Sequence, residues 1–195
     1  MDQSTVASYN ANQQKIADLH HSLVPLPVYE SISEHFKPNS TVLDIGSGTG
    51  RDSCWLDENN YKVTGVDASE GMLETAMVSY PDIPFIQDSL PRLNTIESEQ
   101  SDNVLCAAVL MHLPEAQIGE AVYNLFRITK EGGVILLSFR GTNAEDNRED
   151  GKLYTPINPK ALITLFEHLG ATLLSESQNI EEERGLLWNK LVFRK

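Results

Sequence analysis

The sequence predicts an α/β protein built on a parallel sheet of seven strands, with helices on both faces. Short apolar runs alternate along the chain with segments of helical periodicity, the order expected for strands joined by crossover helices. Runs such as VILLSF at 134–139 carry no polar alternation, which indicates that both faces of those strands are covered. The 195 residues, 41% of them hydrophobic, have the size and composition of one domain with one core.

Seven segments have the composition of strands. Most are continuous runs of Val, Ile and Leu, residues that suit an extended backbone and pack well inside a sheet. The predicted strands lie at 41–45, 62–66, 84–87, 103–109, 134–139, 171–175 and 186–193.

Helices are expected between these strands, and several have recognisable ends. Small polar residues favour the first position of a helix, and proline favours the first turn. Gly132 and Gly170 are expected to end two of the helices. The predicted helices are 70–78, capped by Ser69; 115–130, opened by Pro114; and 160–169, opened by Asn158 and Pro159.

Two further helices, around 4–19 and 28–36, precede the first strand and lie outside the repeating unit. Residues 1–38 are therefore expected to form a helical cap, and a candidate lid, on a core formed by 39–195. No linker rich in Gly, Ser or Pro divides the chain, which predicts a single domain. The polar stretch GTNAEDNREDGK at 141–152 is expected to be a loop.

Charge and composition restrict the partners. The formal net charge of −13 argues against nucleic acid, because binding to a phosphate backbone needs clustered Lys and Arg. No apolar run is long enough for a membrane helix, and the polar N-terminus lacks the features of a signal peptide, so a cytoplasmic location is expected. The histidines show no metal-ligand spacing, so no metal site is predicted.

The stretch VLDIGSGTG at 42–50 contains the most informative motif. A strand runs into Gly46, Gly48 and Gly50, and such a turn lets a ligand approach the backbone closely. A dinucleotide-binding fingerprint has its third glycine at the next position, where this chain has Arg51. The motif therefore resembles a nucleotide-binding turn but departs from that of the dehydrogenases.

Three carboxylates accompany the turn. Asp67 follows the next strand about twenty residues later, where an acid can accept hydrogen bonds from ribose hydroxyls. Asp44, within the first strand, suits an ammonium group and sits badly beside a pyrophosphate. Asp88, after the third strand, could accept from an exocyclic amine such as adenine N6. An amine, a ribose and an adenine without phosphate describe S-adenosylmethionine.

Together, VLDIGSGTG, GVDAS, IQDS and AVLMHLP followed by ITKEGGVILLSF resemble the successive motifs of class I S-adenosylmethionine-dependent methyltransferases. The similarity covers about 9–139. It implies a Rossmann-like, doubly wound, mostly parallel seven-stranded sheet with an antiparallel last strand and an N-terminal helical lid. It also implies S-adenosylmethionine as the cofactor. The cofactor-binding residues that it implies are Tyr9, Asp44, Gly46, Ser47, Gly48, Arg51, Asp67, Ala68, Met72, Asp88, Ser89 and Leu110.

Within that family the chain is most similar to bacterial small-molecule methyltransferases that carry a Tyr-Asn pair in the N-terminal helix and Leu-x-His-Leu-Pro after the fourth strand. The Tyr-Asn pair is Tyr9 and Asn10. His112 lies where a ligand crevice is expected, and its ordinary pKa range suits a base, so it is the candidate catalytic residue. The Asn/Asp-Pro-Pro-Tyr element of exocyclic base methylases is absent, which favours a small-molecule acceptor with an O, N or S nucleophile.

Two alternatives remain open. An NAD(P)-dependent oxidoreductase would share the glycine turn and Asp67, but Arg51 and Asp44 disfavour it. A non-catalytic S-adenosylmethionine-binding regulatory module would keep the turn and lack an open acceptor pocket. A monomer or a homodimer is expected.

Overall fold

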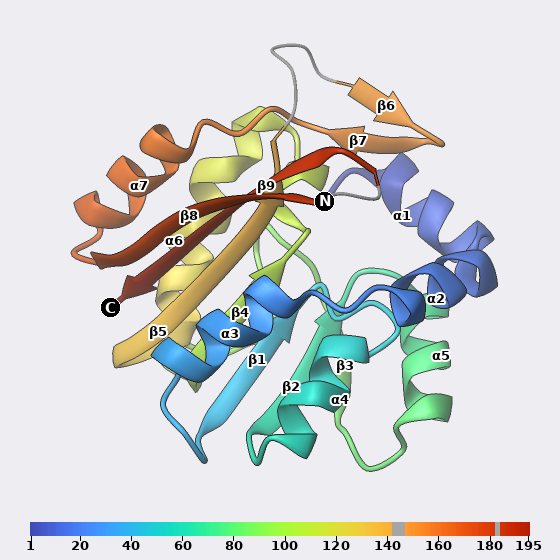
Figure 1. The fold of residues 1–195 in the computed structure, drawn as a ribbon, viewed down its shortest axis with the longest axis horizontal. Coiled ribbons are helices and arrows are strands. Elements are labelled where there is room, and N and C mark those ends of the chain that lie inside the picture. Colours follow the sequence, from blue (N-terminus) through green and yellow to red (C-terminus); the bar gives the residue numbers. More distant parts are fainter. Residues whose placement is uncertain (142–146, 182–183) are drawn as a thin grey trace.

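The computed structural model describes residues 1–141, 147–181 and 184–195. It contains a seven-stranded sheet in the order β3-β2-β1-β4-β5-β9-β8 (Figure 1). Within the described residues, no helix has the length and apolar character needed to cross a membrane. The strands are β1 (Thr41–Ile45), β2 (Lys62–Asp67), β3 (Phe85–Gln87), β4 (Ser101–Ala107), β5 (Thr129–Arg140), β8 (Thr172–Glu181) and β9 (Leu186–Arg194).

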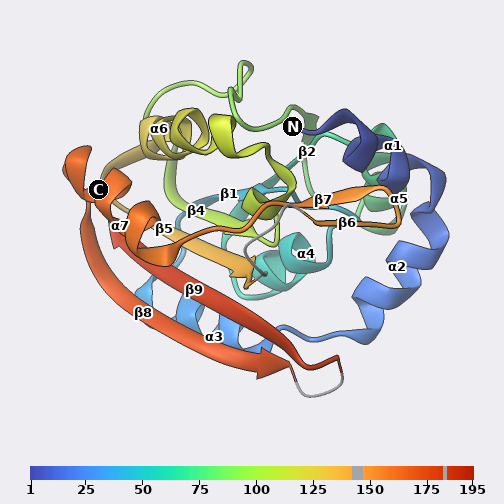
Figure 2. The same ribbon diagram turned by 90° about the horizontal axis from the view of Figure 1, so that it is seen from above.

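Helices cover both faces of the sheet, and α3 and α6 lie on opposite sides of it in Figure 2. On one face, Ile32 and Leu56 from α3 and α4 pack with residues of the central strands. On the other face, Leu125 and Phe166 from α6 and α7 form a second apolar cluster with the same sheet. The helices around the sheet are α3 (Leu26–His35), α4 (Arg51–Glu58), α5 (Glu70–Ser79), α6 (Ile118–Ile128) and α7 (Pro159–His168).

Strand directions confirm the predicted topology. β1 pairs in parallel with β2 and β4, β2 with β3, and β4 with β5. β9 is antiparallel to both of its neighbours, β5 and β8. The strand order reverses between β1 and β4, and in open α/β sheets a ligand crevice forms outside the carboxyl ends of the strands at such a switch point.

The expected helix starts at Ser69 and Asn158 are confirmed, whereas α6 begins at Ile118, after a separate 3₁₀ turn at Glu115–Gln117 that follows Pro114. The Ser69 side chain accepts a hydrogen bond from the Met72 amide at the start of α5, and the Asn158 side chain caps α7. Gly170 follows α7 with a positive φ of 100°. The expectation for Gly132 was wrong: α6 ends at Ile128 and Gly132 lies inside β5. Its φ of 66° falls where β5 first departs from regular pairing with β4.

Other boundaries also differ from the prediction. The expected strand 103–109 ends at Ala107, because Ala108 adopts a left-handed backbone with φ of 61°. The expected helix 4–19 is two helices, α1 (Gln3–Ala11) and α2 (Gln13–Ser22), that meet at Asn12. The expected strand 171–175 extends to Glu181 in β8, where it pairs with β9. Residues 176–181 are mostly polar, so the sequence offered no apolar run that would predict this extension.

The predicted loop 141–152 is in part a β-hairpin. β6 (Asn147–Glu149) pairs antiparallel with β7 (Lys152–Tyr154), and Gly151 in the turn has a φ of 82°. Residues 142–146 of that prediction lie outside the described residues. The hairpin packs against α1 over the carboxyl ends of the parallel strands, which together form the carboxyl edge of the sheet (Figure 1). Two segments far apart in the sequence therefore cover the same edge.

Candidate functional site: the glycine turn and the carboxyl edge of the sheet

The glycine turn joins β1 to α4. Gly46, Gly48 and Gly50 have φ values of 79°, 54° and 83°, a region that side chains with a Cβ seldom adopt. The Gly46 amide donates to the Val66 carbonyl at 2.7 Å, and the Gly48 amide donates to Asp67 Oδ2 at 2.8 Å. The turn is thus held against the end of β2.

Gly46 does not leave open space on its Cβ side. A Cβ built there would lie 2.1 Å from Cγ2 of Val109, a residue that follows β4. The sequence predicted a turn stripped of side chains to admit a ligand. At Gly46 the structure shows that the missing side chain makes room for Val109 instead.

Asp67 joins the turn to the start of α5. Its Oδ1 accepts from the Ser69 amide at 2.8 Å, while Oδ2 accepts from Gly48. Burial raises the pKa of this carboxyl, and the backbone donors act in the opposite direction. Each carboxylate oxygen has two lone pairs, so Asp67 can accept further hydrogen bonds from a ligand.

A pocket of about 610 Å³ lies beside Asp67, between the carboxyl ends of β2 and β3 and helix α1. Asp88 lies in its wall, and its side chain accepts from the Ser89 and Thr95 amides and from the Thr95 hydroxyl. The structure thus brings Ala68, Asp88 and Ser89 together, as predicted for a cofactor site. The pocket is lined by Met1, Gln3, Val6, Ala7, Asn10, Ala68, Gln87, Asp88 and Ser89.

Two buried hydroxyls of the glycine turn have no hydrogen-bond partner within the described part of the chain. They are Ser47 Oγ and Thr49 Oγ1. Buried polar atoms are nearly always satisfied, so unpaired hydroxyls in a ligand-binding turn fit a polar ligand that completes them. This observation agrees with the residues of the turn holding a cofactor.

Asp44 is buried below the turn, at 2% exposure. Ser53 donates to its Oδ2 at 2.6 Å, and burial raises the pKa of the Asp44 carboxyl to about 7, with the neighbouring Asp52 acting in the same direction. The sequence suggested a carboxylate facing a ligand ammonium. In the structure its hydrogen-bond partner is a residue of α4.

Three other predicted cofactor-binding residues, Met72, Leu110 and Arg51, do not line this pocket. Met72 and Leu110 are buried at 1% and 0% exposure. Arg51 forms a bidentate ion pair with Asp52 and donates to the Leu23 carbonyl, so it holds the segment between α2 and α3 against α4.

Asn10 belongs to the site and was not among the predicted cofactor-binding residues. Its Oδ1 accepts from the Ser69 hydroxyl at 2.6 Å and from the Gly71 amide at 3.2 Å. It also lines the pocket. The signal that could have found it is the Tyr-Asn pair, which the sequence analysis used only for the resemblance.

Tyr9 and His112 meet between α1 and the β6–β7 hairpin. The Tyr9 hydroxyl lies 3.2 Å from His112 Nε2, and His112 Nδ1 lies 2.6 Å from the Leu153 carbonyl oxygen. A carbonyl only accepts, so Nδ1 carries the hydrogen and Nε2 accepts from Tyr9. Burial lowers the pKa of His112 to about 4, which makes the ring neutral at pH 7.

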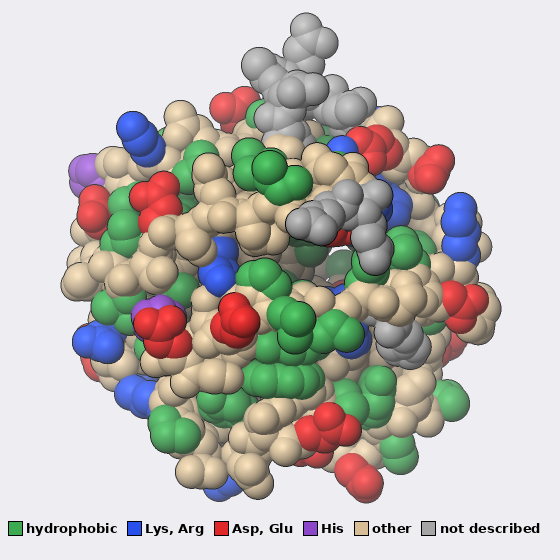
Figure 3. All heavy atoms as spheres, viewed as in Figure 1, with side chains coloured by type: hydrophobic (Ala, Val, Ile, Leu, Met, Phe, Trp, Pro, Cys, Tyr) green, Lys and Arg blue, Asp and Glu red, His purple; other side chains and the backbone are tan. Residues whose placement is uncertain are grey.

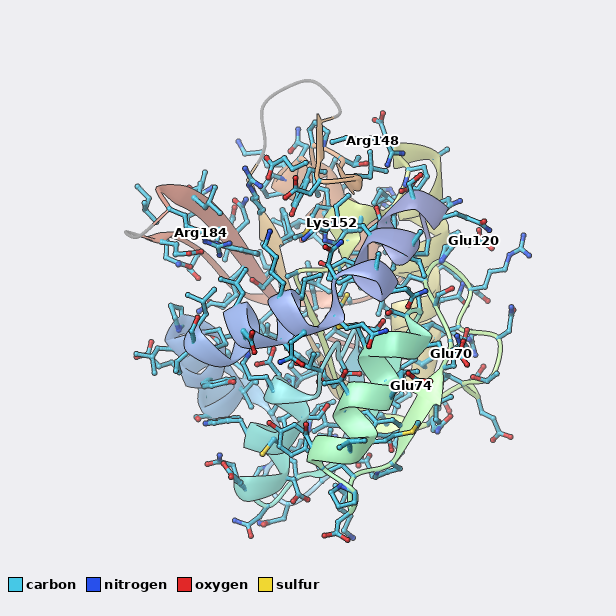
Figure 4. All side chains as sticks on the ribbon, turned by 90° about the vertical axis from the view of Figure 1, so that its right-hand side faces the viewer. Glu70, Glu74, Glu120, Arg148, Lys152 and Arg184 are labelled. Carbon is cyan, nitrogen blue, oxygen red and sulfur yellow. The ribbon has the colours of Figure 1, made fainter. Side chains whose placement is uncertain are left out.

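The β6–β7 hairpin adds side chains that the sequence analysis assigned to a loop or did not use. The Tyr154 ring lies 5.0 Å from the His112 ring, and Arg140 Cζ lies 4.8 Å from the Tyr154 ring centre. Lys152 Nζ lies 5.0 Å from the centre of the Tyr9 ring. Figure 4 shows Lys152 next to α1.

The surface is open near this edge. Figure 3 shows a hollow near the centre of one face, between the β8–β9 hairpin and the segment joining α2 to α3. Among the described residues, no group of three or more His, Cys, Asp or Glu side chains is arranged to hold a metal ion.

An open α/β sheet with a glycine turn after its first strand and a polar pocket at its carboxyl edge defines the Rossmann-like class of nucleotide-binding folds. Residues 42–133 match the methyltransferase domain family. This match, over 92 of the 195 residues, bears out the resemblance to class I S-adenosylmethionine-dependent methyltransferases that the motifs indicate.

Among curated relatives, a putative methyltransferase of Geobacillus sp. (strain WCH70) is 27% identical over 118 residues. That match covers 58% of this chain and 48% of the relative. The arsenite methyltransferase of Homo sapiens is 30% identical over 130 residues, covering 58% of this chain and 34% of that protein. The chain therefore spans less than half the length of these relatives.

Solved structures share the fold over most of the chain. The 1,6-didemethyltoxoflavin-N1-methyltransferase of Burkholderia thailandensis, with 1,6-didemethyltoxoflavin and S-adenosylhomocysteine bound, has a TM-score of 0.81 at 18% identity. The alignment covers 98% of this chain and 87% of that one. The [4+2]-cyclase SpnF has a TM-score of 0.68 at 15% identity, covering 85% and 78%. At such identities the likeness establishes the fold.

Proposed function

We propose that this protein is a methyltransferase that uses S-adenosylmethionine to methylate an O, N or S atom of a small molecule. The observation that carries the proposal is the pocket of about 610 Å³ between Asp88 and α1. Its wall includes Ala68, next in the chain to Asp67, whose carboxylate accepts from the Gly48 amide of the glycine turn. The methyltransferase domain match at 42–133 and the related structure with bound S-adenosylhomocysteine support it.

In this proposal the cofactor supplies a methyl group already activated for transfer. Asp67 accepts from the ribose hydroxyls, Asp88 and Ser89 contact the adenine, and the Ser47 and Thr49 hydroxyls complete the polar contacts at the turn. The protein then has to orient the acceptor and exclude water, and orientation alone can contribute about 7–11 kcal/mol. Helix α1 and the β6–β7 hairpin perform the second task by covering the edge.

His112 as a general base stays a prediction. Its Nε2 accepts from Tyr9, and its lowered pKa makes it a weak base, so it can take a proton from an acceptor only after the Tyr9 hydroxyl gives way. The Tyr9–His112 contact supports a second role for His112, in positioning α1. Tyr9 and His112 together hold α1 over the acceptor end of the edge.

A second candidate function is a different reaction on the same cofactor fold. It is favoured by the likeness to the [4+2]-cyclase SpnF, because that protein shares the fold and its name describes cyclisation. An oxidoreductase is less favoured, since Arg51 at the position of the third dinucleotide glycine is engaged with Asp52 and the Leu23 carbonyl.

Calorimetric titration with S-adenosylhomocysteine and with NAD tests the cofactor. We expect S-adenosylhomocysteine alone to bind, and Asp67→Ala to weaken it at least tenfold, because a hydrogen bond to a charged group contributes about 1.5–3 kcal/mol. Asp57→Ala, at an exposed position on α4, is the matched control. Unchanged affinity in Asp67→Ala would contradict the ribose assignment.

Transfer of labelled methyl groups to a panel of metabolites tests the reaction. Methylation of a panel member supports the methyltransferase. Binding of S-adenosylhomocysteine without methylation of any O, N or S acceptor in the panel argues against the methyltransferase and leaves the second candidate and a non-catalytic S-adenosylmethionine-binding module.

A further inference from the structure

In the part of the chain that the structure describes, Lys152 is a cation without a carboxylate partner. Within the described residues no ion pair closer than 4.0 Å involves it, although the side chain is about half buried. Its ammonium instead lies 5.0 Å from the centre of the Tyr9 ring. Cations with so little exposure are usually paired, which makes Lys152 unusual in this chain.

The surroundings of Lys152 do not neutralise it. Burial lowers the pKa of this lysine, and Lys15 and Arg184 lower it further, while Asp150 and Glu149 act in the opposite direction. The nearest acids are already engaged with other groups or turned outward: Glu149 binds Arg140 through both carboxylate oxygens, at 2.8 and 2.9 Å, and Asp150 is exposed at the hairpin turn.

Positive charge gathers on the hairpin side of α1. Figure 4 shows Lys152 on the same side of α1 as Arg148 and Arg184, whereas Glu70 and Glu74 lie on its other side, on α5. Such an arrangement is notable in a protein with a formal net charge of −13. Arg148 and Arg184 are each paired with a carboxylate, Asp2 and Glu181, so it is the Lys152 ammonium that is left to attract an anion among these three cations.

Aromatic rings stand next to the same ammonium group. Lys152 and Tyr154 are two residues apart in β7, so they project from the same face of the strand. The Tyr154 ring contacts both the His112 ring and Arg140. Arg140 also has a buried Nε without a hydrogen-bond partner in the described structure. A planar molecule can stack here while its charged group reaches a cation.

We propose that Lys152 receives an anionic group of the methyl acceptor, so that the acceptor class is a planar organic anion rather than a neutral ring compound or an amine. This proposal rests on the proposed function, because the bound anion is a methyl acceptor only if the protein transfers methyl groups. The anion lies between Lys152 and the side of Tyr154 that faces Arg140. Lys152 acts here as a specificity-determining residue and takes no part in bond making.

The test compares planar carboxylates with their neutral amides on the protein saturated with S-adenosylhomocysteine. The probes are benzoate and 2-naphthoate, each against its amide, titrated by NMR. We expect the wild type to bind at least one carboxylate ten times more tightly than its amide. Lys152→Met should abolish that preference, and Lys152→Arg should keep most of it, because the charge is retained.

The matched control is Lys62→Met. Lys62 is an exposed lysine at the amino end of β2, away from the carboxyl ends of the strands. It should bind the probes like the wild type. Equal or undetectable binding of acid and amide by the wild type, or an intact preference in Lys152→Met, would overturn the inference. The preceding titration with S-adenosylhomocysteine keeps the two proposals apart. A failure of cofactor binding contradicts the proposed function, and the probes are then titrated into the protein alone to test the anion site.

Discussion

The hydroxyl of Tyr9 donates to Nε2 of His112 across 3.2 Å, and this contact joins α1 to the turn that follows β4. The other nitrogen of the same ring donates to the β6–β7 hairpin at Leu153. One buried imidazole therefore connects both segments that cover the carboxyl edge. The position of α1 and the position of the hairpin therefore depend on the same group.

Removing the Tyr9 hydroxyl should weaken this connection. Tyr9→Phe leaves His112 Nε2 buried without a donor, which costs about 1–3 kcal/mol, and Tyr9→Ala should cost more because the ring is lost too. The free energy of unfolding from urea titration measures both, and calorimetry with S-adenosylhomocysteine shows whether the pocket is affected. Tyr123→Phe, at a position 53% exposed on α6, is the control. Equal stability of the two Phe variants would contradict the role of the hydroxyl.

Asp44 predicts a particular pH dependence. Its pKa in the folded protein is about 7, above the ordinary value of 3.8, so between these values the folded state holds a proton that the unfolded state has lost. Stability is therefore lost as pH rises through this window. Asp44→Asn removes the titration while its amide oxygen can still accept from Ser53. Relative to wild type, the variant should gain stability between pH 4 and 8, by about 1.4 kcal/mol per unit of pKa shift.

Thermal unfolding of both proteins across that range measures the difference. Asp57→Asn, an exposed acid on α4, is the control and should show no such trend. A stability difference between Asp44→Asn and wild type that stays constant with pH would contradict a raised pKa at Asp44.

Gly46 and Val109 should be energetically coupled. Gly46→Ala forces a left-handed φ on a residue with a Cβ and drives that Cβ into Val109, so we expect a loss of about 1–2 kcal/mol from the backbone plus the steric clash. Val109→Ala removes the clashing methyls and should restore part of the loss, while the backbone strain persists. A double-mutant cycle on urea unfolding measures the coupling. Additive effects would show that the turn relaxes away from Val109.

Deletion of residues 1–20 should leave a folded core that binds S-adenosylhomocysteine weakly and transfers methyl groups poorly. The sheet begins at Thr41, but the deletion removes α1, which lines the pocket, and the buried Ile16. Circular dichroism and calorimetry measure the two effects. Asp2→Asn weakens the ion pair with Arg148 but keeps an oxygen that can accept from the Thr5 amide and hydroxyl at the start of α1, so it should affect binding and activity less than the deletion does. Full binding and activity in the truncated protein would show that α1 only packs on the surface and contributes to neither cofactor binding nor methyl transfer.

Much of the architecture could be predicted because it is encoded locally. The runs of Val, Ile and Leu, the caps at Ser69 and Asn158 and the glycines of the first turn each act within a few residues of their own position. Parallel strands also end at the same edge, so acids that follow β2 and β3 had to lie near each other. The succession of strands along the chain, the turn and the positions of Asp67 and Asp88 were therefore predictable from the residues, whereas the antiparallel last strand was implied only by the family resemblance.

The directions of individual side chains depended on packing between segments far apart in the chain. Arg51 turns to Asp52 and Leu23, Val109 fills the space beside Gly46, and the Tyr9 hydroxyl reaches a histidine 103 residues away. No periodicity or spacing encodes such contacts. Each contact depends on the shape and polarity of a partner that is distant in the sequence and comes near only in the folded protein. For the same reason Lys152, in a stretch that looks like a solvated loop, became a half-buried cation only when the hairpin closed over α1.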